Sequence, residues 1–168
     1  MIDLKSASNR EEIILAAGCF WGVEYYLKRL PGVLETEVGY TGGSLNNPSY
    51  EAVCRKDTGH FEAIRVVFDP AKISCTDVLK YFFEIHDPSQ IDGQGPDLGP
   101  QYRSAIFYHS PEQKAIAEKL MQILSDQGMH LATTLHPATT FWPAETYHQD
   151  YYHKNNQAPY CHHWTKRF

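Results

Sequence analysis

Residues 13–22, Ile13-Ile14-Leu15-Ala16-Ala17-Gly18-Cys19-Phe20-Trp21-Gly22, decide both the expected fold and the expected chemistry of the chain. The apolar run over residues 11–17 predicts a short buried strand. Helical spacing from Trp21 to Leu30, ended by Pro31-Gly32, predicts a helix directly after it. Cys19 is therefore expected at a helix start, where unpaired N–H groups and the helix dipole favour the reactive thiolate. From position alone, Cys19 is either a nucleophile or a packed thiol.

The alternation of strand and helix continues along the rest of the chain. The order β-α-β, then β-α-β, predicts a split βαβ, ferredoxin-like core. This is an α/β (α+β) fold with a mixed, mostly antiparallel sheet and helices on one face. The glycine-rich loop over residues 87–101 is long enough to be functional. Strands are predicted at 33–40, 60–68, 103–109 and 132–135, helices at 74–86, 110–127 and 145–154, and one helical turn at 50–53.

Length and charge exclude several classes of protein. The 168 residues fit one catalytic domain over 1–168, with a loose extension over 1–10 and a mobile, coil-rich tail over 155–168. The formal net charge of -5 argues against nucleic acid or an anionic membrane as the main partner. No apolar run approaches the roughly 18 residues of a membrane span, and no secretory signal opens the chain, so a reducing cytoplasm is expected. The cysteines then represent thiols rather than disulfides.

A second candidate group is the carboxyl of Glu62, in the most apolar predicted strand. His60 and Ile64 lie on the same strand face. If that face is buried, the pKa of Glu62 is raised, and the carboxyl can hold a proton near neutral pH and act as a general acid. Alternatively, Glu62 faces solvent and pairs with Arg65 or Lys56.

Two further features lie outside the first strand and helix. Cys161, in the predicted tail, is a second thiol that can condense with a sulfenic acid to form a disulfide. The loop over residues 93–102 carries Asp97 and Tyr102 on a glycine-rich frame, and by itself this segment indicates only a turn. Cys75, in the first turn of a predicted helix, is expected to be structural.

Eight motifs of the chain resemble, in the same order, those of the A-type peptide methionine sulfoxide reductases. The resemblance covers roughly residues 11–161 and implies an α/β fold with a split βαβ core. It also implies a role in protein repair under oxidative stress. The motifs are Gly18–Gly22 with Glu24, Gly39–Gly43, Asn47–Cys54, Thr58–Ala63, His86–Pro88, Gln101–Ile106, Phe141–Glu145 and His148–Tyr151.

The resemblance implies a complete set of site residues. Cys19 would attack the sulfur of methionine-S-sulfoxide, protein-bound or free, while Glu62 protonates its oxygen. Cys161 would resolve the resulting sulfenic acid as a disulfide, with Cys54 as the substitute. The substrate-binding residues would be Phe20 and Trp21 for the methyl group, Tyr50 and Tyr102 for the oxygen, and Asp97 for the polar end of the site.

The resemblance also implies the reductant. Thioredoxin or another dithiol would reduce the disulfide between Cys19 and Cys161, and no metal or organic cofactor is needed.

Two other classes of function remain open from the residues. One is an acyl-transfer hydrolase in which Cys19 is activated by His60 or His86 as base. The other is a zinc-dependent module. Its ligands would come from the histidines and the cysteine near the end of the chain: His148, His153, Cys161, His162 and His163.

Overall fold

The computed structural model of the chain describes residues 10–54, 58–155, 162 and 164–168. A six-stranded sheet with the order β7-β6-β1-β3-β2-β8 forms its centre. β6 and β7 run parallel, and the other neighbouring strands run antiparallel. The strands are β1 (Glu11–Ala17), β2 (Val33–Thr41), β3 (Phe61–Phe68), β6 (Ser104–Tyr108), β7 (Thr134–Pro137) and β8 (Phe141–Pro143).

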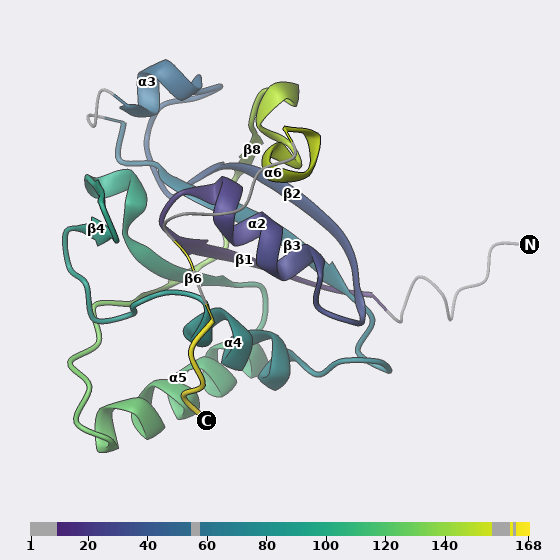
Figure 1. Cartoon of the computed structure of the whole chain (residues 1–168), viewed down its shortest axis with the longest axis vertical. Helices are drawn as coiled ribbons and strands as arrows, with labels where there is room; N and C mark the ends of the chain where they lie inside the picture. The colour runs from purple at the N-terminus through teal and green to yellow at the C-terminus, as the bar shows by residue number, and fades with distance from the viewer. Residues whose placement is uncertain (1–9, 55–57, 156–161, 163) are drawn as a thin grey trace, which may run out of the picture.

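Two split βαβ units build this sheet, as predicted. The unit β1-α2-β2 leaves room for β3 between its strands, and the unit β3-α4-β6 leaves room for β1. α2 crosses in front of β1 and β3, whereas α4 and α5 lie together further along the sheet (Figure 1). These helices are α2 (Phe20–Lys28), α4 (Cys75–Glu84) and α5 (Pro111–Asp126).

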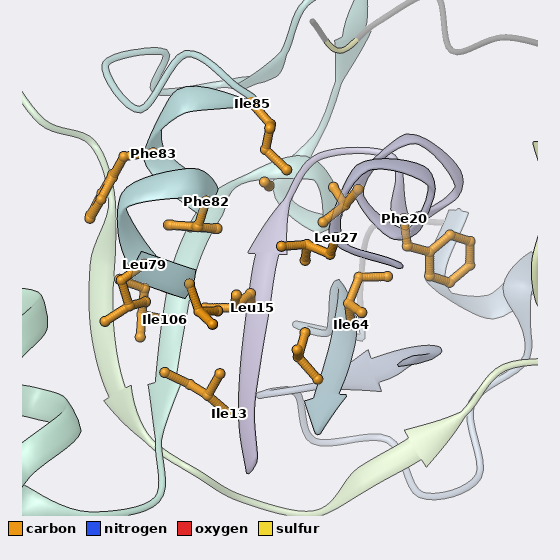
Figure 2. Packing of buried hydrophobic residues seen from close by; sticks show 14 of the residues in the cluster. Ile13, Leu15, Phe20, Leu27, Ile64, Leu79, Phe82, Phe83, Ile85 and Ile106 are labelled. Atoms are coloured by element: carbon orange, nitrogen blue, oxygen red, sulfur yellow. The ribbon is translucent and has the colours of Figure 1, made fainter. Parts of the chain in front are cut away.

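The core explains why the first strand is continuously apolar from Ile13 to Ala17. Ile13 and Leu15 point to the helices, where they meet side chains of α4 and of β6 (Figure 2). Ile14 and Ala16 point to the opposite face, where they pack with Phe61 and other small or aromatic residues. From Ile13 to Ala17, β1 is therefore buried on both faces, and it has neighbouring strands on both edges, so no position in this stretch can be polar at low cost.

Short elements connect this frame to the site. They are α3 (Tyr50–Cys54), the two-stranded β4 (Gly93–Gln94) and β5 (Asp97–Leu98), the 3-10 turns η1 (Pro100–Tyr102) and η2 (Thr146–His148), and α6 (Tyr151–Lys154).

The prediction of one helix over residues 145–154 is wrong. Only η2 and the four-residue α6 form there, because Asp150 between them has a left-handed backbone, with φ of 56°. The N–H group of Asp150 donates to the buried carboxylate of Glu24 on α2, which holds this turn in place. β8 was not predicted, and β7 begins two residues later than expected, at Thr134.

Residues 164–168 form no helix or strand, and they are attached to the end of α4. The Thr165 N–H donates to the carbonyl oxygen of Glu84, and the Arg167 side chain donates to the carbonyl oxygens of Phe83 and His86. The expected tail beginning at residue 155 is therefore packed in this part. Residues 1–9 and 156–161, with Lys56 and His163, lie outside the described residues. Across the part of the chain that is described, none of the helices has the length and apolar character needed to cross a membrane.

Candidate active site

Cys19 is placed at a helix start by a glycine turn, as predicted. β1 ends at Ala17, and Gly18 turns the chain with φ of 91°. The carbonyl oxygen of Cys19 accepts the first helical bonds, from the N–H groups of Gly22 and Val23. Cys19 is thus the N-cap residue of α2, and only 7% of it is exposed. Its thiol lies where backbone N–H groups and the helix dipole stabilise negative charge.

Glu62 reaches the same helix end from β3. Its Oε1 accepts a hydrogen bond of 3.2 Å from the Phe20 N–H, and its Oε2 is buried with no hydrogen-bond partner among the described residues. Burial, together with the nearby Cys19 and Asp97, raises the pKa of Glu62 well above its ordinary value, although the Phe20 bond opposes this. The raised pKa favours the neutral carboxyl, which can donate a proton.

The outward orientation that the sequence left open for Glu62 does not occur. Glu62 is 1% exposed. Arg65, further along the same strand, points to the other face and pairs with Glu12, Glu35 and Glu37. The alternation of the strand separates the buried acid from the exposed cation.

Two tyrosines and an aspartate complete the polar side of the site. Burial first, and then the charge of Glu62, raise the pKa of both Tyr50 and Tyr102. Cys19 and Asp97 contribute further to the raised pKa of Tyr102. Tyr50 comes from α3, whereas Asp97 in β5 and Tyr102 in η1 belong to the same glycine-rich loop, so two separate segments bring these groups to Glu62. Both hydroxyl groups stay protonated at neutral pH and can donate hydrogen bonds.

Aromatic rings form the apolar side. Phe20 is fully buried, with its ring centroid 6.4 Å from that of Tyr50. Trp21 is stacked on Tyr151 at 3.8 Å, and its indole N–H donates to Nδ1 of His148 at 2.9 Å. His148 lies against the Tyr50 ring at 4.4 Å, so the two expected methyl-pocket residues are held by a rigid aromatic cluster.

The glycine-rich loop reaches the site through Gln94. The Gln94 side chain bonds both backbone groups of Asp87, at 2.7 and 2.9 Å. Its stem packs on Gly18 so closely that a Cβ at Gly18 would lie 2.5 Å from the Gln94 Cβ. This contact fixes the β4–β5 hairpin, and with it Asp97, against the cysteine turn.

The two histidines proposed as bases for a hydrolase both form hydrogen bonds to groups other than Cys19. His60 accepts from the Gly43 N–H at 3.1 Å and donates to the Leu45 carbonyl oxygen at 2.6 Å. His86 bonds the Phe82 carbonyl oxygen and the Ser104 hydroxyl, and burial lowers its pKa to about 3. Neither histidine has a ring nitrogen left to activate Cys19.

The histidines proposed as zinc ligands are also dispersed. His148 is bonded to Trp21 inside the aromatic cluster, and His153 is exposed on α6. Cys161 and His163 lie outside the described residues. Within residues 10–54, 58–155, 162 and 164–168, no group of three histidine, cysteine or acidic side chains is arranged to hold a metal ion.

His162 has a place that the sequence did not indicate. It is 3% exposed, and its Nε2 donates to the Ala17 carbonyl oxygen at 2.6 Å. A Cβ added at Gly22 would lie 2.2 Å from its Nδ1, so the imidazole lies directly on the first turn of α2. Burial lowers the pKa of His162, which keeps the ring neutral beside the cysteine turn.

Comparison with known proteins gives the family. Residues 11–168 match the family model for peptide methionine sulfoxide reductase. The chain belongs to the peptide methionine sulfoxide reductase family. The peptide methionine sulfoxide reductase MsrA of Thermus thermophilus is 54% identical over 153 residues, 90% of this chain and 87% of that protein. The enzyme class expected from the motifs, a methionine sulfoxide reductase, is confirmed.

Solved structures of peptide methionine sulfoxide reductases share the fold. Reduced Mxr1 from Saccharomyces cerevisiae matches with a TM-score of 0.86 and 37% identity, over 94% of this chain and 93% of that one. Methionine sulfoxide reductase A of Corynebacterium diphtheriae matches with a TM-score of 0.80 and 35% identity, over 95% and 82%. Mxr1 has also been solved in complex with Trx2; that chain is 24% identical, with a TM-score of 0.62. The expected fold class is confirmed.

The sequence did not predict that two residues, Glu145 and His148, hold the reductase site together: Glu145 had no assigned role, and His148 was considered only as a zinc ligand. Glu145 and His148 both stand in motifs shared with the family, but their spacing from Cys19 gives no sign of contact. β8 and η2 lie on the β2 side of the sheet and carry both residues back to α2 and α3. The contact could have been predicted only if β8 had been recognised as a strand. That was not possible, because β8 has three residues, one of them proline, and is too short to show a periodic pattern.

Proposed function

We propose that the chain reduces methionine-S-sulfoxide to methionine by direct attack of the Cys19 sulfur. The observation that carries this is the position of Glu62 beside Cys19 at the start of α2. A neutral acid with one buried, unbonded oxygen next to a thiol suits a substrate whose oxygen must be protonated before its sulfur is attacked.

The first step moves one oxygen atom. Because Oε1 of Glu62 accepts the Phe20 N–H, the proton is on Oε2 and is donated to the sulfoxide oxygen. The Tyr50 and Tyr102 hydroxyl groups donate to the same oxygen. The Cys19 thiolate bonds to the substrate sulfur. The oxygen then bonds to the Cys19 sulfur, while its bond to the substrate sulfur and the bond between the two sulfurs break. Cys19 is left as sulfenic acid, and methionine leaves. The substrate sulfur is reduced and Cys19 is oxidised.

The second step regenerates the enzyme. The Cys161 thiol attacks the sulfenic acid, forms a disulfide with Cys19 and releases water. A thioredoxin dithiol then reduces this disulfide and is itself oxidised. The complex of the yeast relative Mxr1 with Trx2 supports thioredoxin as the reductant. Cys54, near Tyr50 and Tyr102, is the other candidate for the thiol that attacks the sulfenic acid.

The arrangement also favours one epimer. The methyl group faces the cluster of Phe20 and Trp21, the oxygen faces Glu62 and the tyrosines, and the sulfur faces Cys19. Three different contacts around a chiral sulfur are compatible with only one configuration at that sulfur. We assign the S epimer by resemblance to the family.

The test is mass spectrometry after one equivalent of an S-sulfoxide peptide, without reductant. We expect one methionine per enzyme, two thiols lost, and a disulfide between Cys19 and Cys161. Cys19→Ser should give no methionine, and Cys161→Ser should complete one turnover but lose thioredoxin-driven cycling. Methionine formation while Cys19 stays reduced would contradict the first step, and full cycling by Cys161→Ser would contradict the second.

A further inference from the structure

The carboxylate of Glu145 joins two parts of the reductase site. Its Oε1 accepts a hydrogen bond from the Tyr40 hydroxyl at 3.0 Å, and its Oε2 accepts one from the Tyr50 N–H at 3.1 Å. Tyr40 is fully buried on β2, with its ring 5.6 Å from that of Phe20. The same side chain is thus bonded to the residue behind the methyl pocket and to the helix that carries an oxygen-binding tyrosine.

The helix that carries Tyr50, α3, depends for its stability on contacts with residues outside the helix. α3 has only five residues, and a helix of that length is not stable by itself. Its first N–H groups need acceptors from outside the helix. The Ser49 hydroxyl accepts from the Ala52 N–H at 3.1 Å, and Glu145 supplies the acceptor for the Tyr50 N–H. The position of Tyr50 therefore depends on a residue far away in the sequence.

Glu145 itself is held firmly. The Ala144 N–H donates to the carbonyl oxygen of Val38 at 2.9 Å, so the residue directly follows the β8 edge of the sheet. Burial pushes the pKa of Glu145 up. The hydrogen bonds from the Tyr50 N–H, from its own backbone N–H and from the Tyr40 hydroxyl, together with nearby His148, outweigh burial and leave the pKa below its ordinary value. An ionised carboxylate makes both bonds charge-assisted, and these are the stronger kind.

From these contacts we infer that Glu145 is a positioning residue, which sets the Tyr50 hydroxyl at the right distance from the methyl pocket for a sulfoxide to be bound at both. This inference rests on the proposed function, in which Tyr50 binds the substrate oxygen. Glu145 touches no reacting atom. It acts by fixing the separation between the tyrosine of α3 and the rings of Phe20 and Trp21.

The test is Glu145→Gln, measured with an S-sulfoxide peptide and dithiothreitol. The amide has one oxygen in place of two, so Tyr40 and Tyr50 compete for one acceptor. We expect the KM to rise about tenfold, because one of the two groups that bind the sulfoxide is displaced relative to the other. A merely destabilising change would reduce the amount of active enzyme, which lowers kcat and leaves KM unchanged.

A second substitution sharpens the experiment. Tyr40→Phe removes the competing donor, so the remaining amide oxygen of Glu145→Gln is free for the Tyr50 N–H. The double variant should therefore have a lower KM than Glu145→Gln alone. The matched control is Glu51→Gln, an exposed glutamate on the same helix, which should keep the parent KM.

The outcomes separate the inference from the function it rests on. If the parent enzyme forms no methionine, the proposed function fails. If the parent is active and Glu145→Gln keeps KM within about twofold, or Tyr40→Phe worsens it, the positioning role is wrong. An equal rise in KM with Glu51→Gln would also overturn it, because any change in α3 would then have the same effect.

Discussion

Glu62 shows how one residue can take its chemistry from its surroundings. The two-residue period of β3 turns it inward while Arg65 turns outward; the strand itself was predicted from the sequence, but the orientation of Glu62 was left open. The bond from the Phe20 N–H could not be predicted, because it joins residues whose approach depends on how α2 lies across the sheet. Contacts of that kind decide which of the two carboxyl oxygens holds the proton.

The stability of the enzyme should depend on pH through this carboxyl. Since the folded-state pKa of Glu62 is raised, its contribution is fully present below the ordinary carboxyl pKa of about 4.3 and is lost as pH rises through the raised value. Glu62→Gln has no such proton to lose. The free energy of unfolding of Glu62→Gln minus that of the parent should therefore increase from pH 5 to pH 8, measured by urea denaturation. A difference that stays constant over this range would contradict the buried neutral acid.

At the scale of elements, the predictions succeeded where a pattern runs over a full strand or helix. Ser74 and Ser110 accept from the N–H groups of Asp77 and Gln113, as expected of helix N-caps. The failures lie in residues 134–154. There the strands have only three or four residues and Asp150 has a left-handed backbone, so the sequence shows no periodic pattern of apolar residues. That segment holds its place by side-chain bonds to the sheet edge rather than by regular structure.

Gln149 makes the main hydrogen bonds that attach that segment to the sheet. Its side chain accepts from the Val38 N–H at 2.9 Å and donates to the carbonyl oxygens of Val38 and Ala144, so it continues the β2 ladder beyond β8. Gln149→Ala should lower the free energy of unfolding by about 2 kcal/mol, since three bonds are lost at about 0.5–1.5 kcal/mol each. Chemical denaturation tests this, with the exposed Gln122→Ala on α5 as control. Equal losses in the two variants would contradict the edge role.

At the scale of the whole molecule, the split βαβ core could be predicted from the order of strands and helices, but the complete site could not be predicted from the core. The strand and helix patterns predicted where Cys19 and Glu62 lie in the chain, because Cys19 is at the junction of β1 and α2 and Glu62 is within β3. Tyr50, Asp97 and Tyr102 come from short loops, and only their resemblance to a family indicated them. The packing of His162 on Gly22 had no signal in the sequence, because it joins residues from opposite ends of the described chain.

Gly22→Ala should reveal that long-range contact. In an exposed helix this change stabilises by up to about 1 kcal/mol. Here the added methyl group would lie 2.2 Å from Nδ1 of the buried His162, so the imidazole must leave the Ala17 carbonyl oxygen. We expect a lower melting temperature than the parent, and a smaller effect of Gly22→Ala when His162 is already alanine. A stabilised Gly22→Ala variant would show that the histidine moves aside freely.

The central place of β1 has a consequence for newly made protein. Residues 14–17 leave the ribosome early, but their partners on β6 are made about ninety residues later, which takes several seconds at typical rates of synthesis. Until then, one edge of an entirely apolar segment has no neighbour, and such a segment is prone to pair with other chains. Nascent copies of this enzyme should therefore need a chaperone until translation has passed residue 108.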